Sequence, residues 1–196
     1  LDDGSEASIT IGGTVSPAGG NFEEPVTQAT LKVVGAFHGL ARERSDARKY
    51  PAIHPVDSWS KYKGVVDMDL VNRARGILIR STEVNQMMKV VGEEGTSSED
   101  YIIYQKGELL DAVYLQQNSF DPIDEACVPE RQRREFNRLY DALTKKYDIT
   151  DKREIRAFFN QLRQEFLDWH GCEFETPEFE AQEKKISDFY MAKVVE

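Results

Sequence analysis

A helical repeat of apolar residues begins near Val65, and it constrains the fold more than any other feature of the sequence. Apolar side chains recur at intervals of three and four, so they line one face of a helix. They are Met68, Val71, Ala74, Ile77 and Leu78, followed by Val84, Met87, Met88 and Val91. Gly92 interrupts the repeat, as glycine does at helix ends. We therefore predict a long helix that ends at Gly92 and buries Met87 and Met88 in the core.

A second helix is expected directly after this one. Ser97 and Ser98 are suitable N-caps, and Glu99 and Asp100 would lie at the positive end of the helix dipole. The apolar residues that follow form a buried stripe, which consists of Ile102, Ile103, Leu109, Leu110 and Val113. Together the two helices predict a hairpin with an acidic tip over residues 93–100.

Three further helices are predicted from their end signals and apolar faces. Pro129 can begin the third helix, because the first turn needs no N–H from it. Asp151 and Glu154 are a potential capping pair for a fourth helix that ends at Gly171. A fifth helix, from about Glu178, is less amphipathic, so we expect it to depend on its neighbours or to fray. The apolar faces of the third and fourth helices carry Phe136, Leu139, Tyr140 and Leu143, and Ile155, Phe158, Phe159, Leu162 and Phe166.

Residues 1–63 have a different sequence pattern from the rest of the chain, because turn-forming residues alternate with short apolar runs. Ile9-Thr10-Ile11 and Ala29–Val34 are rich in β-branched residues and predict strands, although periodicity also allows a helix for the second. This change of sequence pattern suggests a domain boundary between residues 63 and 64. Three other segments complete the region: a turn at residues 16–20, a helix over residues 39–46, and a fixed extended loop at residues 50–55 with two prolines.

Composition indicates a globular protein and argues against two classes of function. There are 25 Lys and Arg against 35 Asp and Glu, and the net charge of −10 disfavours a protein that coats nucleic acid or an anionic bilayer. The longest apolar-leaning stretch, Val33–Ala41, is too short to span a membrane. Cys127 and Cys172 lack the spacing of a zinc site or a disulfide framework. We expect a cytoplasmic protein, and the acidic start after Leu1 suggests a piece of a longer chain.

No complete active site is recognisable in these residues. The phosphate-binding GxxxxGK[ST] pattern, the GxSxG nucleophile turn and the HExxH metal motif are all missing from the sequence. A run of charge at Arg131, Arg133 and Arg134 predicts a solvated helix face. The three histidines are scattered, so we expect structural roles for His38, His54 and His170.

Four segments carry a resemblance to a known family. They are SPAGGNFEEPVTQAT at Ser16–Thr30, ARERSDARKYPAIHPVDSWSKY at Ala41–Tyr62, YLQQNSFDPID at Tyr114–Asp124, and Cys127-Val128-Pro129-Glu130. In this order and spacing they resemble the catalytic A subunits of the A/V-type rotary ATPases, downstream of the P-loop and the catalytic carboxylate. The resemblance implies a mainly α fold. A helical C-terminal domain, residues 64–196, would follow the last strands and loops of a parallel α/β P-loop nucleotide-binding domain, residues 1–63.

The resemblance implies an activity for the complete subunit. It would hydrolyse or synthesise Mg-ATP, coupled to proton or sodium translocation. The phosphate-binding lysine, the general-base carboxylate and the Mg²⁺ ligands would lie upstream, and an arginine finger would come from the non-catalytic B subunit. This chain alone would hold no catalytic or metal-binding residue and would be inactive. Its partners would be B subunits in an alternating hexamer and the central rotor stalk, without nucleic acid or direct membrane insertion, in a cytoplasmic complex peripheral to a membrane.

An adenine site is implied by the same resemblance. Because Tyr50 precedes Pro51, its backbone is restricted, and a fixed loop can offer the ring as a stacking surface for a purine. By position, Tyr50 and Phe120 would lie on opposite sides of the adenine, with Gln116 and Gln117 as polar neighbours. The alternative is that Tyr50 and Phe120 are ordinary core aromatics.

The acidic hairpin tip would face the central rotor, as the corresponding helix-turn-helix does in this family. Acids there could meet basic rotor residues as the hairpin moves with nucleotide binding. The alternative is that the tip is only a solvated turn. The rotor-facing residues would be Glu93, Glu94, Ser97, Glu99 and Asp100.

Two departures from the family pattern leave other interpretations open. His54-Pro55 stands where A-type chains usually have Asn-Trp, which is nearer to the Asp-Pro of the F-type β subunit, and Tyr50 replaces the usual Phe. One rival is therefore an F-type β subunit or a type III secretion ATPase, although the QQNSFDP run argues against both. Another is a stand-alone helical interaction module without nucleotide chemistry.

Overall fold

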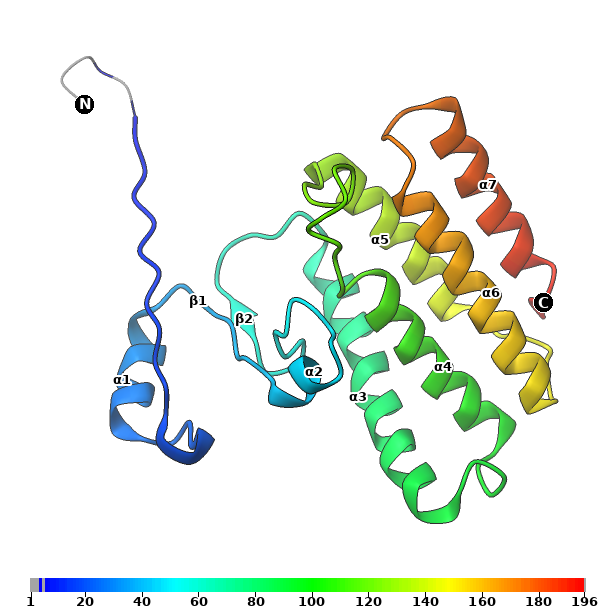
Figure 1. The fold of residues 1–196 in the computed structure, drawn as a ribbon, viewed down its shortest axis with the longest axis horizontal. Coiled ribbons are helices and arrows are strands. Elements are labelled where there is room, and N and C mark those ends of the chain that lie inside the picture. Colours follow the sequence, from blue (N-terminus) through cyan, green and yellow to red (C-terminus); the bar gives the residue numbers. More distant parts are fainter. Residues whose placement is uncertain (1–3, 5, 196) are drawn as a thin grey trace.

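The protein is mostly helical, with a bundle of long helices in its C-terminal part. The computed structural model describes residue 4 and residues 6–195. Within them, the segments before the bundle lie to one side of it (Figure 1). A mainly α fold class is thereby confirmed. The bundle consists of α3 (Met68–Val91), α4 (Ser98–Val113), α5 (Pro129–Thr144), α6 (Lys152–His170) and α7 (Pro177–Met191).

The predicted hairpin is confirmed as α3 and α4, and its ends follow the expected capping chemistry. The carboxylate of Asp67 accepts a hydrogen bond from the backbone nitrogen of Asp69 at 2.8 Å and so caps α3. Gly92, with a φ of 80°, ends this helix. Ser97 caps α4, because its Oγ accepts from the backbone nitrogen of Asp100 at 3.1 Å.

The two helices of the hairpin approach each other closely at Gly107. A Cβ atom at this position would lie 2.1 Å from Ser81 Oγ and 2.3 Å from Ser81 Cβ. Ser81 is itself buried, and its hydroxyl donates to the carbonyl oxygen of Tyr104 at 3.1 Å. Because a short buried side chain cannot move aside, only glycine fits at this crossing.

The core lies where α4, α5, α6 and α7 meet. Trp169 of α6 is completely buried, and its Nε1 donates to the carbonyl oxygen of Phe179 at 3.0 Å. The predicted ends of α6 are also confirmed, because the Asp151 side chain caps its N-terminus and Gly171 follows its last residue. Other side chains exposed by 1% or less include Tyr101, Leu139, Ile155, Leu162 and Phe166.

The last helix, α7, is held more firmly than its weak amphipathic pattern indicates. It begins at Pro177 and buries Phe179, Ile186 and Tyr190 completely. Glu183 is also buried on this face, where it pairs with arginines of α5. A buried glutamate lowers the apparent amphipathicity of a helix, which is why the sequence understated the packing of α7.

The first region contains less regular structure than expected, and both strand predictions are wrong. Ala29–Val34 falls mostly in helix α1 (Pro25–Val33), which Pro25 can begin at its first position, and Val33 is exposed. Within the described residues, Ile9-Thr10-Ile11 pairs with no strand, and both isoleucines are about nine-tenths exposed. The expected turn at residues 16–20 is present as a short 3-10 helix, Ala18–Gly20. The two strands that do form, β1 (Ala36–Phe37) and β2 (Trp59–Ser60), are antiparallel to each other.

Two further expectations about this part of the chain are corrected. The helix expected over residues 39–46 is shorter, because α2 covers only Arg42–Asp46. Residues 50–55 form the predicted loop, in which the Tyr50-Pro51 peptide bond is cis and Ile53 bridges to Leu40. In α3, Met88 packs against the core as expected, but Met87 is 40% exposed.

Candidate functional site

Two loops that lie far apart in the sequence meet at one end of the helical bundle. They are the 50–55 loop and the 114–124 loop, which follows α4. A backbone hydrogen bond joins them, donated by the nitrogen of Gln117 to the carbonyl oxygen of Tyr50 at 3.2 Å. Between the loops and the bundle lies a cavity of about 460 Å³, to which Pro51, Ile53 and Pro55 contribute from the first loop. This volume is in the range of sites for small organic molecules.

The structure brings some of the predicted adenine residues to this cavity and leaves others outside it. Pro51, Gln116 and Gln117 line the cavity. Tyr50 and Phe120 do not line it, and their side chains are 55% and 95% exposed. The alternative that these two rings are core aromatics is therefore wrong, because neither is buried.

The two glutamines are held by hydrogen bonds within the chain. Gln116 Nε2 donates to the carbonyl oxygen of Asp111 at 3.2 Å, and Gln117 Nε2 donates to that of Asp124 at 2.7 Å. Because each amide nitrogen is directed into the protein, the side-chain oxygen is the group that each glutamine can offer to a ligand.

The inner part of the cavity carries a buried polar cluster that the sequence did not reveal. Arg131 Nε donates to Glu135 at 2.7 Å, and Arg131 Nη2 donates to the carbonyl oxygen of His170 at 2.6 Å. His170 Nε2 lies 3.8 Å from the carboxylate of Glu135. Burial lowers the pKa of His170 from its usual value, and the nearby Glu135 opposes this shift. His170 thus lies in contact with a buried ion pair.

Arg131 corrects the prediction of a solvated arginine face. It is only 5% exposed, and its guanidinium also lies 5.8 Å from the ring centre of Phe179. The four-residue spacing of Arg131 and Glu135 was the available signal, because residues at this spacing meet on a helix. Their burial depends on α6 and α7, which no local pattern specifies.

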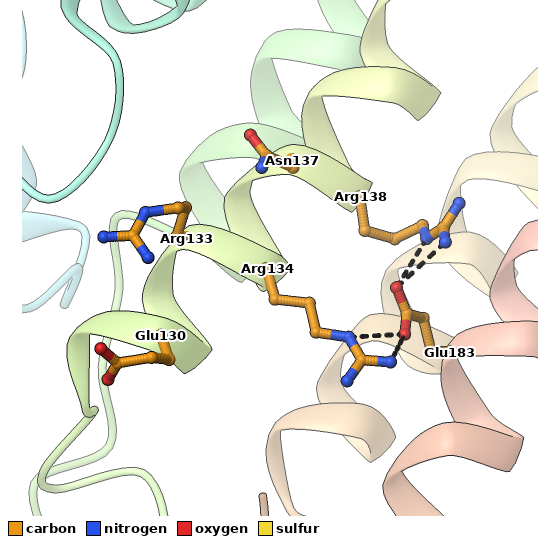
Figure 2. A pocket seen from close by; sticks show the side chains of 6 residues that line it. All are labelled: Glu130, Arg133, Arg134, Asn137, Arg138 and Glu183. Carbon is orange, nitrogen blue, oxygen red and sulfur yellow. Dashed lines mark hydrogen bonds and ion pairs between the residues drawn. The ribbon is translucent and has the colours of Figure 1, made fainter. Parts of the chain in front are cut away.

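The other arginines of this run border a second cavity, of about 380 Å³, between α5 and α7. Figure 2 shows Arg134 and Arg138 directed at Glu183, while Arg133 points the other way. Arg134 also pairs with Glu180, and these contacts raise the pKa of its guanidinium. Because glutamates already neutralise the two inward arginines, this cavity is a structural charge network and not an anion site.

A second buried ion-pair cluster lies at the other side of the 50–55 loop. Asp111 of α4 is 6% exposed and accepts from Arg44 at 2.6 Å and from Lys49 at 2.5 Å. Two nitrogens of Arg44, Nε and Nη2, are buried without a hydrogen-bond partner in the described part of the chain. The signal that could have found this cluster is an acidic residue within the apolar stripe Leu109, Leu110 and Val113.

The acidic hairpin tip is partly engaged with α6. Glu93 pairs with Arg156 at 2.5 Å, and Lys152 Nζ donates to the carbonyl oxygens of Glu93 and Glu94. Asp100 lies 3.3 Å from Arg80 of α3. The remaining two acids, Glu94 and Glu99, make no ion pair with the residues that the structure describes, and both are exposed.

Among the described residues, no group of three or more His, Cys, Asp or Glu side chains is arranged to hold a metal ion. None of the described helices is both long and apolar enough to cross a membrane.

Comparison with known proteins assigns both regions of the chain to one kind of protein. Residues 68–159 match the family model for the C-terminal domain of V and A type ATP synthase. Residues 2–60 match the nucleotide-binding domain of the ATP synthase alpha/beta family. A V-type ATP synthase alpha chain from Treponema denticola is 61% identical over 186 residues, which is 95% of this chain. The chain belongs to the V-type ATP synthase alpha-chain family.

The V-type alpha chains that this chain matches are considerably longer than the chain itself. It covers 32% of the Treponema denticola protein and 34% of an alpha chain from Borrelia turicatae, to which it is 58% identical over 193 residues. The chain thus spans about a third of the length of the curated relatives it matches. A solved structure, the unique ATP synthase subunit NeqB from Nanoarcheaum equitans, is 17% identical, with a TM-score of 0.52 over 63% of this chain and 32% of that one. At this identity the likeness concerns the fold alone.

Membership of the V-type alpha-chain family also answers the question raised by His54-Pro55. The relatives match across the segment that contains His54-Pro55, so this departure does not exclude the family. His54 itself lies in a turn, where its Nδ1 accepts from the backbone nitrogen of Asp57 at 3.0 Å.

Proposed function

We propose that this chain is the C-terminal part of the catalytic subunit of an A/V-type rotary ATPase. The complete subunit couples ATP hydrolysis or synthesis to proton or sodium translocation. One observation carries the proposal: the 50–55 loop and the 114–124 loop meet across the cavity of about 460 Å³. Each loop belongs to a different family-matched segment. Ligand sites commonly lie where two domains meet. The domain boundary falls between residues 63 and 64, in the short interval that separates the two matched segments.

The chain contributes the adenine-side wall of the nucleotide site. Tyr50 and Phe120 offer exposed rings for stacking from the same two loops whose residues Pro51, Gln116 and Gln117 line the cavity. An adenine fits this set of residues, because aromatic faces bind its ring and glutamine oxygens can accept from its amino group. ATP or ADP is therefore the ligand of the complete subunit.

The remaining chemistry belongs to other parts of the subunit and complex. The sequence has no GxxxxGK[ST] pattern to hold the phosphates. The phosphate and Mg²⁺ ligands thus lie outside this chain, and the chain alone is inactive. Mg²⁺ would be held by residues outside this chain and would neutralise charge on the phosphates. Phosphate release by the purified 196-residue chain above the buffer background would contradict this part of the proposal.

The partners are the non-catalytic B subunit, in an alternating hexamer, and the central rotor stalk. The acidic tip is the rotor-facing surface, and it presents Glu93, Glu94, Ser97, Glu99 and Asp100. Two of its acids, Glu94 and Glu99, make no ion pair within the described residues and can meet basic rotor side chains. The complex lies in the cytoplasm, peripheral to the membrane whose ion gradient it uses or builds.

Replacement of Tyr50 by alanine in the complete subunit tests the proposed site. We expect weaker ATP binding by about 1 kcal/mol, the size of an aromatic stacking contribution. Isothermal titration with ATP measures the loss. Tyr50→Phe is the matched control, because it keeps the ring and removes only the hydroxyl, and its affinity should equal that of the unchanged subunit. Equal affinity in the folded Tyr50→Ala subunit would show that this ring does not contact the nucleotide.

A further inference from the structure

A carboxylate near the C-terminal end of α4 joins the helical bundle to the loops that precede it. Asp111 is 6% exposed and lies among the residues that give α4 its buried face, Leu109, Leu110 and Val113. A carboxylate is rarely buried to this extent without partners, because its charge loses hydration. The partners of Asp111 therefore decide what this residue does.

Both partners come from the region before the bundle. Oδ1 of Asp111 accepts from Arg44 of α2 at 2.6 Å, and Oδ2 accepts from Lys49 at 2.5 Å. In the described part of the chain, every ion pair between residues 6–63 and later residues ends on Asp111 or on Glu108, one turn before it. The charged connection between the two regions is thus concentrated on one turn of α4.

Asp111 also connects both loops that line the cavity. Lys49 directly precedes Tyr50, so the ion pair holds the start of the 50–55 loop. The carbonyl oxygen of Asp111 accepts from Gln116 Nε2 at 3.2 Å, and the carbonyl oxygen of Tyr50 accepts from the Gln117 nitrogen at 3.2 Å. Through its side chain and its backbone, Asp111 fixes the positions of the two loops relative to each other.

The opposite end of α4 is the hairpin tip. Asp111 lies in the last turn of this helix and Ser97 caps the first. Figure 1 shows the α3–α4 turn at one end of the hairpin and the loop after α4 at the other. The close approach of Gly107 to Ser81 keeps α4 from sliding along α3. Asp111 and the cap of the tip therefore belong to one helix, whose register against α3 is fixed at Gly107.

We propose that Asp111 is a positioning residue whose ion pairs with Arg44 and Lys49 hold the 50–55 loop on α4, and that the hairpin motion expected in this family acts on the nucleotide site through this contact. This inference rests on the function proposed above. Removal of the Asp111 charge would leave the buried Arg44 without a counter-ion. The 50–55 loop would then lose its fixed position relative to Gln116.

The test is Asp111→Asn in the complete ATPase complex, assembled in membrane vesicles. We expect the KM for ATP to rise about tenfold, because a displaced loop misaligns the bound base. We also expect fewer ions transported per ATP hydrolysed. Asp111→Glu keeps the charge and should restore both quantities in part.

A matched control separates positioning from general stability. Asp141 is also a paired carboxylate, which accepts from Tyr190 Oη at 2.5 Å and lies 2.9 Å from Lys145, but its partners are all within the bundle. Asp141→Asn should lower the thermal stability and leave the KM and the ion-to-ATP ratio unchanged. A purely structural role for Asp111 predicts the same behaviour from Asp111→Asn, and that result would overturn the proposal.

Two further outcomes are informative. If Asp111→Asn does not assemble, Lys49→Met removes one cation and leaves the Arg44 pair, and an unchanged KM and ratio in that variant would also overturn the proposal. The proposed function fails separately, if Tyr50→Ala leaves ATP affinity unchanged. If Tyr50→Ala weakens binding while Asp111→Asn changes neither quantity, only the role of Asp111 is wrong.

Discussion

The two regions of the molecule bury their apolar side chains to very different extents. In residues 6–63, Ala41 is the only hydrophobic side chain in the buried core of the described chain, while Ile9, Ile11 and Val33 are more than four-fifths exposed. From Val66 onward, the bundle buries large aromatic and aliphatic side chains throughout. The bundle is therefore stabilised by its own apolar core. The first region is ordered mainly through loops and ion pairs.

The largest difference between the regions should appear on truncation of an apolar side chain. Trp169→Ala removes a fully buried ring and its hydrogen bond to Phe179, and we expect it to lower the free energy of unfolding by about 3–5 kcal/mol. Ile9→Ala should cost less than about 0.5 kcal/mol, because Ile9 is 90% exposed. Urea unfolding of the 196-residue chain measures both. Similar losses in the two variants would break the comparison.

Two glycines provide a second contrast between the regions. Gly107→Ala places a Cβ against the short, buried Ser81 side chain, and we expect a loss of about 1–3 kcal/mol in the free energy of unfolding. Gly35→Ala would meet Tyr62 Oη at 2.4 Å, yet the exposed Tyr62 side chain can swing away. Thermal unfolding of both variants measures the difference. A stable Gly107→Ala protein would mean that the hairpin crossing is looser than described.

Helix capping also differs between the regions, with a smaller expected effect. Ser97→Ala removes the side-chain cap of α4, which should cost about 1 kcal/mol. Glu24 stands at the N-cap of α1 without a side-chain cap hydrogen bond, so Glu24→Ala should change stability little. Chemical denaturation of the two variants gives both values. An equal cost at Glu24 would show that α1 is more strongly coupled to the fold than its exposure suggests.

The smallest expected effect concerns pH. Burial lowers the pKa of His170 below its unfolded value, so its stabilising contribution is complete above about pH 6.5 and is lost as the pH falls toward the folded pKa. His170→Gln should therefore reduce the loss of stability on acidification below about pH 6.5. The exposed His38 provides the control His38→Gln, which should keep the parent profile. Denaturation series between about pH 5 and pH 8 cover the relevant window.

The sequence predicted the bundle well because its signals are local. The α3–α4 hairpin, Pro129 and the Asp151 cap all depend on residues within a few positions of one another, and each is present. The strand prediction for Ala29–Val34 failed because short β-branched runs are ambiguous, and Pro25 at the first helical position carried more information.

Only part of the candidate site could be predicted from the sequence. Pro51, Gln116 and Gln117 could be placed together through the family resemblance, and they do line one cavity. The partners of Arg131 and Asp111 could not, because these charges are buried by helices and loops far along the chain. Asp111, for example, pairs with residues more than 60 positions away. Whether a charged residue is solvated depends on such tertiary neighbours and not on its local pattern.

The close crossing at Gly107 gives the hairpin the properties of a lever. From Asp111 to Ser98, α4 extends over about 20 Å, so a tilt of about 10° at the Asp111 end would displace the tip by roughly 3 Å. Small changes at the loop end are thus geometrically amplified at the acidic end. The two helices can move as one rigid unit, because the length of α4 alone produces the larger displacement at the tip.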